Sequence, residues 1–355
     1  MTGFHTVICT DWSARAQPSP ARPSADAIWI AVARNAAEAA TAPSSRQGMT
    51  EGTRSRGGAE RRIGAGLRGG AGAVIGTGSG DGSGDGSGAG AGAGVDGEAA
   101  LAAVAVRTHY LRTRHAARAM LMDLLAGELA AGRRVLAGFD FPFGYPQGYA
   151  AALTGTATAF AVWDWLRDRV CDGPQNANNR FEMAAAINAR LPGLGPFWGR
   201  PGGLDLPALP DRGSLRHGHG MTERRRVEIH VRRAQPVWKL YTTGSVGSQA
   251  LLGLPVLAAL RDRFGGALAV WPLDPPARVA TARIVLAEIY PGLIDTAVRA
   301  ELAAAGGIKD EVQVRLLAQV LLGADLPGLL TQVPDWPGRA EEGWILGPRA
   351  VGGAP

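Results

Sequence analysis

Two aspartates in this chain each end a short apolar run. Asp11 closes V-I-C-T-D, and Asp140 closes V-L-A-G-F-D. If the two runs are neighbouring strands, both carboxylates point into one crevice at the carboxyl edge of a sheet, where open α/β sheets bind ligands. Converging carboxylates repel one another and are stable mainly when Mg²⁺ or Mn²⁺ neutralises them. Such an ion can bind a phosphate oxygen, activate water and stabilise a leaving oxygen.

Two further acids are candidates for the same site. Glu288 stands in the apolar run A-E-I-Y-P, and Asp310 stands in I-K-D-E beside Lys309. Ordinary interpretations exist, because aspartates form turns and acids favour the first turn of a helix. Burying unpaired carboxylates is costly, however, and this cost favours a shared metal site. We expect Asp11 and Asp140 to bind the metal, Glu288 and Asp310 to complete or orient the shell, and Lys309 to balance charge.

Three groups of residues are candidates for contact with a substrate. The run T-T-G-S-V-G-S-Q at 242–249 could present backbone amides to a phosphate, with Lys239, Ser245 and Ser248 as contacts, or could simply begin a helix. Arg180, in a polar loop, is a second candidate. The arginines at 224–226, 232 and 233 could track a phosphate backbone or form a solvated charged face.

Apolar periodicity predicts the elements that would position these residues. Five segments have strand character: 5–11, 26–34, 104–112, 133–140 and 283–291. A right-handed crossover would make the fourth strand parallel to one of the first three.

Helices are predicted between and after the strands. Thr113 can cap a helix that ends at Gly132 and carries leucines at 121, 124, 125 and 129 on one face. A second helix, over 309–322, is predicted to bury Val312, Leu316, Leu317 and Val320.

Composition divides the rest of the 355 residues. Residues 35–98 are rich in Gly, Ala and Ser, and they predict a disordered insert because they cannot offset the entropy of ordering. Residues 151–276 predict a helical insertion that covers the carboxyl edge of the sheet, within a domain spanning 1–348. The tail at 349–355 is expected to be loose.

Cysteine spacing and hydropathy argue against a zinc-binding, disulfide-rich or membrane-spanning protein, whereas the net charge does not discriminate. The net charge is +6, but only two of the 37 basic residues are lysines, a pattern that fits a GC-rich genome as well as nucleic-acid binding. The two cysteines have no zinc-ligand or disulfide spacing. No run approaches the ~20 apolar residues of a membrane span, and no leader is apparent. We expect a cytoplasmic protein with no membrane partner.

Five motifs occur in a recognisable order: D-W-S-A, F-D-F-P-F-G-Y-P, A-E-I-Y-P, K-D and E-G-W-I-L. As a set they resemble an uncharacterised bacterial family of predicted ribonuclease-H-like nucleases, over 5–34, 104–150 and 283–347. The resemblance implies a mixed five-stranded sheet flanked by helices, and an acidic cluster formed by Asp11, Asp140, Glu288 and Asp310. The family usually has another acid one turn later, where this chain has Val314. That difference favours metal binding over efficient two-metal cleavage.

A second resemblance spans nearly the whole chain. The stretches G-P-F-W-G, W-K-L-Y-T-T-G-S-V-G-S-Q-A-L-L-G-L-P and A-E-E-G-W-I-L-G are similar to proteobacterial proteins labelled molybdopterin-guanine dinucleotide synthesis. The chain has neither the Gly-rich start of a nucleotidyltransferase nor a phosphate loop. Three hypotheses follow: a Mg²⁺- or Mn²⁺-dependent nuclease or phosphodiesterase, a molybdenum-cofactor biosynthesis protein acting on a pterin or nucleotide, and a non-catalytic nucleotide-binding module.

Overall fold

The computed structural model describes residues 3–35, 104–231, 233–333 and 335–347. The predicted disordered insert, apart from its first residue, and the predicted loose tail lie outside the described residues. None of the helices in the described ranges is long and apolar enough to cross a membrane.

Strands and helices occupy the following ranges. The strands are β1 (Thr6–Asp11), β2 (Ile28–Asn35), β3 (Val104–Leu111), β4 (Val135–Phe139), β5 (Leu268–Trp271) and β6 (Ile284–Glu288). The helices are α2 (Arg114–Ala130), α3 (Tyr149–Thr154), α4 (Ala159–Arg167), α5 (Arg180–Asn188), α6 (Arg226–His230), α7 (Gly247–Phe264), α8 (Pro276–Thr281), α9 (Asp295–Ala305), α10 (Lys309–Leu322), α11 (Leu326–Leu329) and α12 (Arg339–Glu342).

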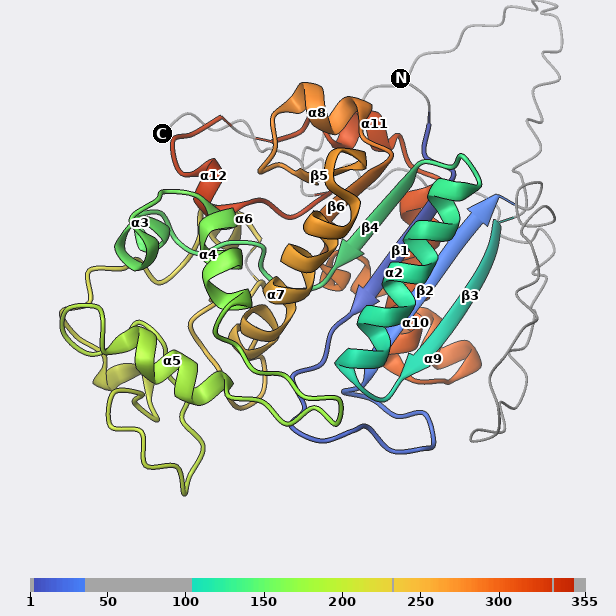
Figure 1. The fold of residues 1–355 in the computed structure, drawn as a ribbon. Coiled ribbons are helices and arrows are strands. Elements are labelled where there is room, and N and C mark those ends of the chain that lie inside the picture. Colours follow the sequence, from blue (N-terminus) through green and yellow to red (C-terminus); the bar gives the residue numbers. More distant parts are fainter. Residues whose placement is uncertain (1–2, 36–103, 232, 334, 348–355) are drawn as a thin grey trace, which may run out of the picture.

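The strands form one mixed six-stranded sheet in the order β3-β2-β1-β4-β6-β5 (Figure 1). β2 is antiparallel to both neighbours, whereas β4 is parallel to β1, β6 to β4 and β5 to β6. The five predicted strands are present, and the predicted parallel crossover is confirmed. The sheet nevertheless has six strands rather than five. The additional strand, β5, is four fully buried residues with no polar alternation, and it lies inside the range predicted as a helical insertion.

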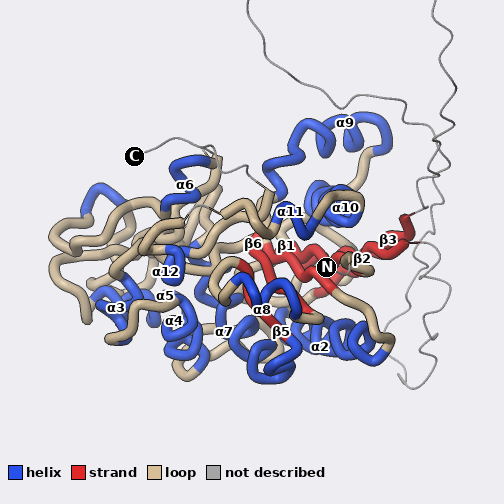
Figure 2. Tube along the Cα trace, turned by 90° about the horizontal axis from the view of Figure 1, so that it is seen from above, coloured by secondary structure: helices blue, strands red, loops and turns tan. Residues whose placement is uncertain are grey.

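Helices cover both faces of the sheet, which gives an α/β molecule of three layers (Figure 2). Alternate residues of β1 divide between the faces, as strand geometry requires. Ile8 belongs to the core shared with α2 and α7, whereas Val7 and Cys9 belong to the core shared with α10. α9 lies beside α10, on the same side of the sheet (Figure 2).

The two predicted core helices have the expected bounds. Thr113 caps α2 by accepting a hydrogen bond from the N–H of Ala116 (3.2 Å). In α10 the prediction of the buried face is wrong in part, because Val320 is 52% exposed and Val314 is fully buried. The helix is turned so that Val314, Leu317, Ala318 and Leu321 face the sheet.

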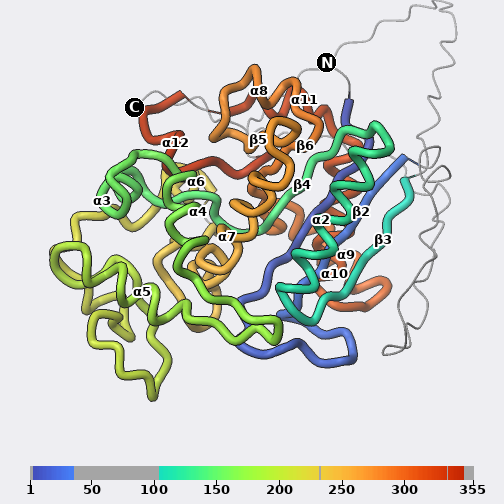
Figure 3. The backbone as a smooth tube through the Cα atoms, in the orientation of Figure 1, coloured from blue at the N-terminus to red at the C-terminus, as the bar shows by residue number. Residues whose placement is uncertain are grey.

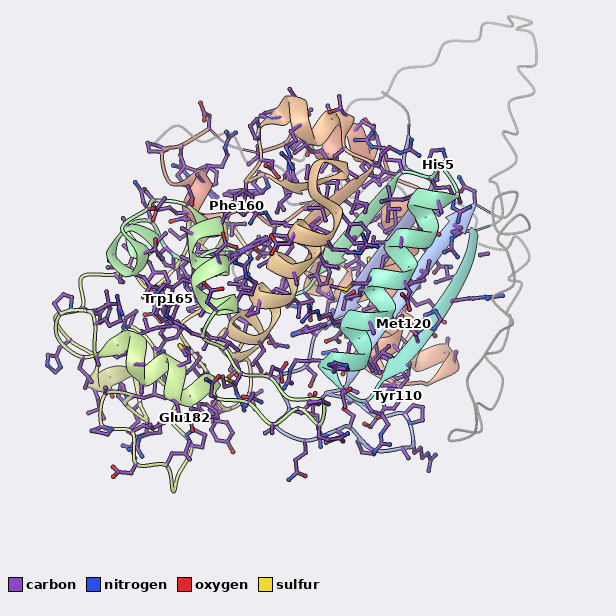
Figure 4. The ribbon with its side chains drawn as sticks, in the orientation of Figure 1. His5, Tyr110, Met120, Phe160, Trp165 and Glu182 are labelled. Carbon is purple, nitrogen blue, oxygen red and sulfur yellow. The ribbon has the colours of Figure 1, made fainter. Side chains whose placement is uncertain are left out.

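The small helices α3 to α6 gather on the side of the molecule opposite β3 (Figure 3). α4 packs against α7, where the guanidinium carbon of Arg261 lies 3.8 Å from the centre of the Phe160 ring. Figure 4 labels Phe160 and Trp165, which both belong to α4. Arg180 of α5 donates to Ser248 in the first turn of α7, and Gln249 in the same turn donates to Trp12, which directly follows β1.

Candidate active site

Asp11 and Asp140 lie side by side at the carboxyl edge of the sheet. β1 and β4 are parallel, with Thr10 paired to Phe139, so the next residue of each strand is an aspartate. The backbone fixes both positions: Trp12 donates its N–H to Oδ1 of Asp140 (2.7 Å), and Asp140 donates its own N–H to the carbonyl of Thr10 (3.2 Å). The two carboxyl groups interact directly, and each perturbs the pKa of the other. The structure therefore brings together the two residues that the sequence singled out first.

Burial makes this pair retain a proton. It raises the pKa of Asp11 well above its usual range, and repulsion from Asp140 and Asp310 adds to the effect. Burial also raises the pKa of Asp140, to about 7, against the opposing hydrogen bond from Trp12. Because both pKa values are raised, the pair holds a proton near neutral pH. At neutral pH the pair therefore favours any cation, whether a proton or a metal ion, that removes the repulsion.

Asp310 and Asp26 extend the acidic cluster. Oδ2 of Asp310 accepts a hydrogen bond from the backbone N–H of Asp26 (2.8 Å). The pKa of Asp310 is raised by burial and by the charge of Asp26, while Lys309 opposes the change. Sequence reasoning missed Asp26. Because β2 is antiparallel to β1, a residue just before β2 lies at the edge where β1 ends, and this signal was available in the sequence.

Glu288 lies at the same edge but does not join the pair. Along a strand, successive side chains point to opposite faces. Asp11, with Asp140 beside it, shares its side of the sheet with Cys9, toward α10. Glu288 shares its side with Leu286, toward α2 and α7. Contrary to the expectation that Glu288 completes the metal shell, its side chain points to the opposite face of the sheet from Asp11 and Asp140.

A buried arginine neutralises Glu288 instead. Arg225 donates from Nη1 to Oε2 (2.8 Å) and from Nη2 to Oε1 (2.6 Å) of Glu288, and from Nε to Glu228 (2.7 Å). The N–H of Phe143 also donates to Oε2 of Glu288 (2.9 Å). Both oxygens of Glu288 are thus satisfied, and Arg225, just before α6, is tied to the end of β6.

Lys309 stands at the start of α10, on the side of the acid pair that carries Asp310. With Asp140 it lines a pocket of about 360 Å³. The other lining residues are Arg233, Tyr290, Pro291, Gly292, Asp295 and Gln313. Val314, where a further acid was considered, faces the sheet, so Gln313 is the α10 residue that reaches the pocket one turn after Lys309.

The polar groups of the Gly-rich segment at 242–249 bind within the segment and its neighbours. Lys239 donates to the carbonyl of Thr243 (2.7 Å). Ser248 donates to a backbone carbonyl (2.6 Å) and accepts from Nε of Arg180 (3.0 Å). The N–H of Ser245 closes a turn (3.2 Å). These predicted substrate contacts therefore stabilise the loop that leads into α7, and none of the four lines the pocket.

One residue of α7 contacts the turn that follows Asp11. Nε2 of Gln249 donates to the backbone carbonyl of Trp12 (2.7 Å), next to Asp11. Sequence analysis did not single out Gln249, because a glutamine near a helix start carries no distinctive pattern. The contact fixes the turn that leaves β1.

The acids suit an ion held by one or two carboxylates better than an ion whose ligands all come from the protein. Over the described ranges, no group of three or more His, Cys, Asp or Glu side chains is close enough to hold a metal ion. Mg²⁺ commonly uses one or two carboxylates and takes its remaining ligands from water and substrate phosphates. Asp11 and Asp140 suit that mode, since a divalent ion would replace their shared proton.

The chain matches no family model, no curated protein and no solved structure.

Proposed function

We propose that this protein is a metal-dependent phosphoryl-transfer enzyme, most simply a phosphodiesterase or nuclease, built on a ribonuclease-H-like sheet. The observation that carries the proposal is the pair of interacting carboxyl groups, Asp11 and Asp140, at the ends of adjacent parallel strands. Such a pair lowers its free energy when a divalent cation binds, and the carboxyl edge of a sheet of this kind is where ligands bind. Mg²⁺ or Mn²⁺ would supply charge neutralisation at a phosphate oxygen and an activated water.

Each acidic residue has a distinct role in this proposal. Asp11 and Asp140 hold the ion, and the backbone N–H of Trp12 orients the carboxylate of Asp140. Asp310, fixed by the N–H of Asp26, adds negative charge from the α10 side. Lys309 offsets part of that charge. Glu288 acts only through Arg225, by holding the segment before α6 against the sheet.

Hydrolysis of bis(p-nitrophenyl) phosphate, a general phosphodiester probe, tests the proposal. We expect Mn²⁺-dependent release of p-nitrophenol by the wild type, and none above background for Asp11→Asn, because the variant lacks one of the two ion-binding carboxylates. Asp123→Asn is the matched control, since Asp123 is exposed on α2. Equal rates for Asp11→Asn and the wild type would rule out the acid pair as the centre of the reaction.

A further inference from the structure

The pocket beside the acid pair is lined by two basic side chains, Arg233 and Lys309. Asp295 is shared between Arg233 (3.2 Å) and Arg299 (3.4 Å), so one carboxylate faces two guanidinium groups. Lys309 is exposed and makes no side-chain hydrogen bond or ion pair with any described residue. The lining thus holds two bases, Arg233 and Lys309, and two acids, Asp140 and Asp295, and Lys309 is the base that an anion can engage without breaking an ion pair.

The other basic residues nearby are already used by the fold. Arg224 donates to backbone carbonyls of Glu228 (3.3 Å) and Ala234 (2.8 Å). Arg225 is buried against Glu288, and the guanidinium of Arg226 lies over a tryptophan ring. A protein that follows a nucleic-acid backbone needs a row of free cations, and each phosphate contact adds to the affinity. Among the described arginines of this run, Arg233 alone lines the pocket, which suits a single phosphate group.

The size and remaining lining of the pocket suggest what carries that phosphate. A volume of about 360 Å³ lies near the lower end of the range for small-molecule sites. Tyr290, half-buried at the pocket wall, offers an aromatic surface, and Gln313 offers an amide that can both donate and accept. Both groups suit a planar, polar ring such as a nucleobase.

We infer that the pocket binds a nucleotide-sized phosphate monoester, with its phosphate held by Lys309 and Arg233 beside Asp140. This inference rests on the proposed function, because a nucleotide monoester is the product that hydrolysis of a nucleotide phosphodiester at the same site would release. The phosphate would approach the acid pair from the α10 side, where Asp140 forms part of the pocket wall.

Calorimetric titration of AMP into the metal-free protein, with a chelator present, tests the inference. The chain has only two lysines, which makes the pair of variants Lys309→Met and Lys239→Met decisive. We expect Lys309→Met to weaken AMP binding at least about tenfold, as loss of a charge-assisted hydrogen bond does, and Lys239→Met to leave it unchanged. Both side chains lie at the surface or half-buried, and circular dichroism verifies that each variant folds.

Three outcomes would overturn the inference. They are the absence of AMP binding by the wild type, a loss of binding on Lys239→Met in place of Lys309→Met, and equal binding of inorganic phosphate or of an oligonucleotide with hydroxyl ends.

Asp140→Asn separates this inference from the proposed function. It should tighten metal-free AMP binding several-fold by removing a negative charge from the wall, whereas it should abolish Mn²⁺ binding. Mn²⁺ binding by the wild type without AMP binding would refute this inference and leave the proposed function intact. AMP binding without Mn²⁺ binding would refute the metal site and support only the nucleotide pocket.

Discussion

Replacing Asp140 by asparagine should stabilise the metal-free protein, and only above acidic pH. The pKa of Asp140 is raised from 3.8 to about 7, mainly by burial. The folded chain therefore binds more protons than the unfolded chain between these two values, and the stability of the wild type falls as pH rises through this window. An asparagine side chain at this position carries no charge, so the variant escapes this loss.

The magnitude follows from the size of the pKa change. At about 1.36 kcal/mol per pH unit, the change from 3.8 to about 7 gives an upper limit of about 4 kcal/mol. Asp140 is not fully buried, and solvent screens part of its repulsion, so we expect a gain of about 2 kcal/mol in the free energy of unfolding near pH 8. Below about pH 4 the gain should vanish, because Asp140 is then protonated in both states.

Urea unfolding of the two proteins in a chelating buffer, at several pH values, measures this difference. Asparagine keeps the acceptor for the N–H of Trp12, and its amide NH2 can donate to Asp11, so the variant loses the charge and keeps the polar contacts. Asp123→Asn, at an exposed position of α2, should give a pH-independent difference. A variant that is less stable than the wild type at pH 8, by the same amount as at pH 4, would refute the idea that the acid pair is electrostatically strained.

Three other predictions concern the packing that supports the site. Arg225→Met leaves the buried charge of Glu288 without its cation, so the free energy of unfolding in urea should fall by about 3–5 kcal/mol, and adding Glu288→Gln should restore part of it. No restoration would contradict the pairing. A Cβ added at Gly253 would lie 2.3 Å from a buried phenylalanine ring, whereas one at Gly127 meets nothing within 4 Å. In thermal unfolding, Gly253→Ala should therefore cost about 1–3 kcal/mol and Gly127→Ala should gain about 0.5–1 kcal/mol, and equal effects would be inconsistent with this packing. Val314→Asp buries a charge against the sheet, so it should destabilise the protein by at least about 3 kcal/mol without raising Mn²⁺ affinity; tighter Mn²⁺ binding by a folded variant would mean that α10 is turned differently.

Local patterns in the sequence were enough to predict most of the sheet and the acid pair. Apolar runs bounded by turn residues located five strands, and the capping threonine located the start of α2. Asp11 and Asp140 could be paired because each follows its strand directly, and a parallel crossover brings such ends together. These inferences need only periodicity and handedness, which are properties of short segments.

Features that depend on distant partners could not be predicted. The direction of the Glu288 side chain depends on the register between β4 and β6, and its neutralisation depends on Arg225, 63 residues away. The buried face of α10 was misassigned because Val314 and Val320 are equally apolar, and only the sheet decides which one is covered. β5 is too short and too uniformly apolar to be separated from the helix before it.

Calorimetric titration of Mn²⁺ into the wild type, Asp11→Asn and Asp140→Asn tests the central claim most directly. We expect saturable binding by the wild type, with proton release as the ion replaces the shared proton, and no binding by either variant while circular dichroism confirms their folds. Absence of Mn²⁺ binding by the wild type, or binding that survives both substitutions, would contradict a metal site formed by this acid pair.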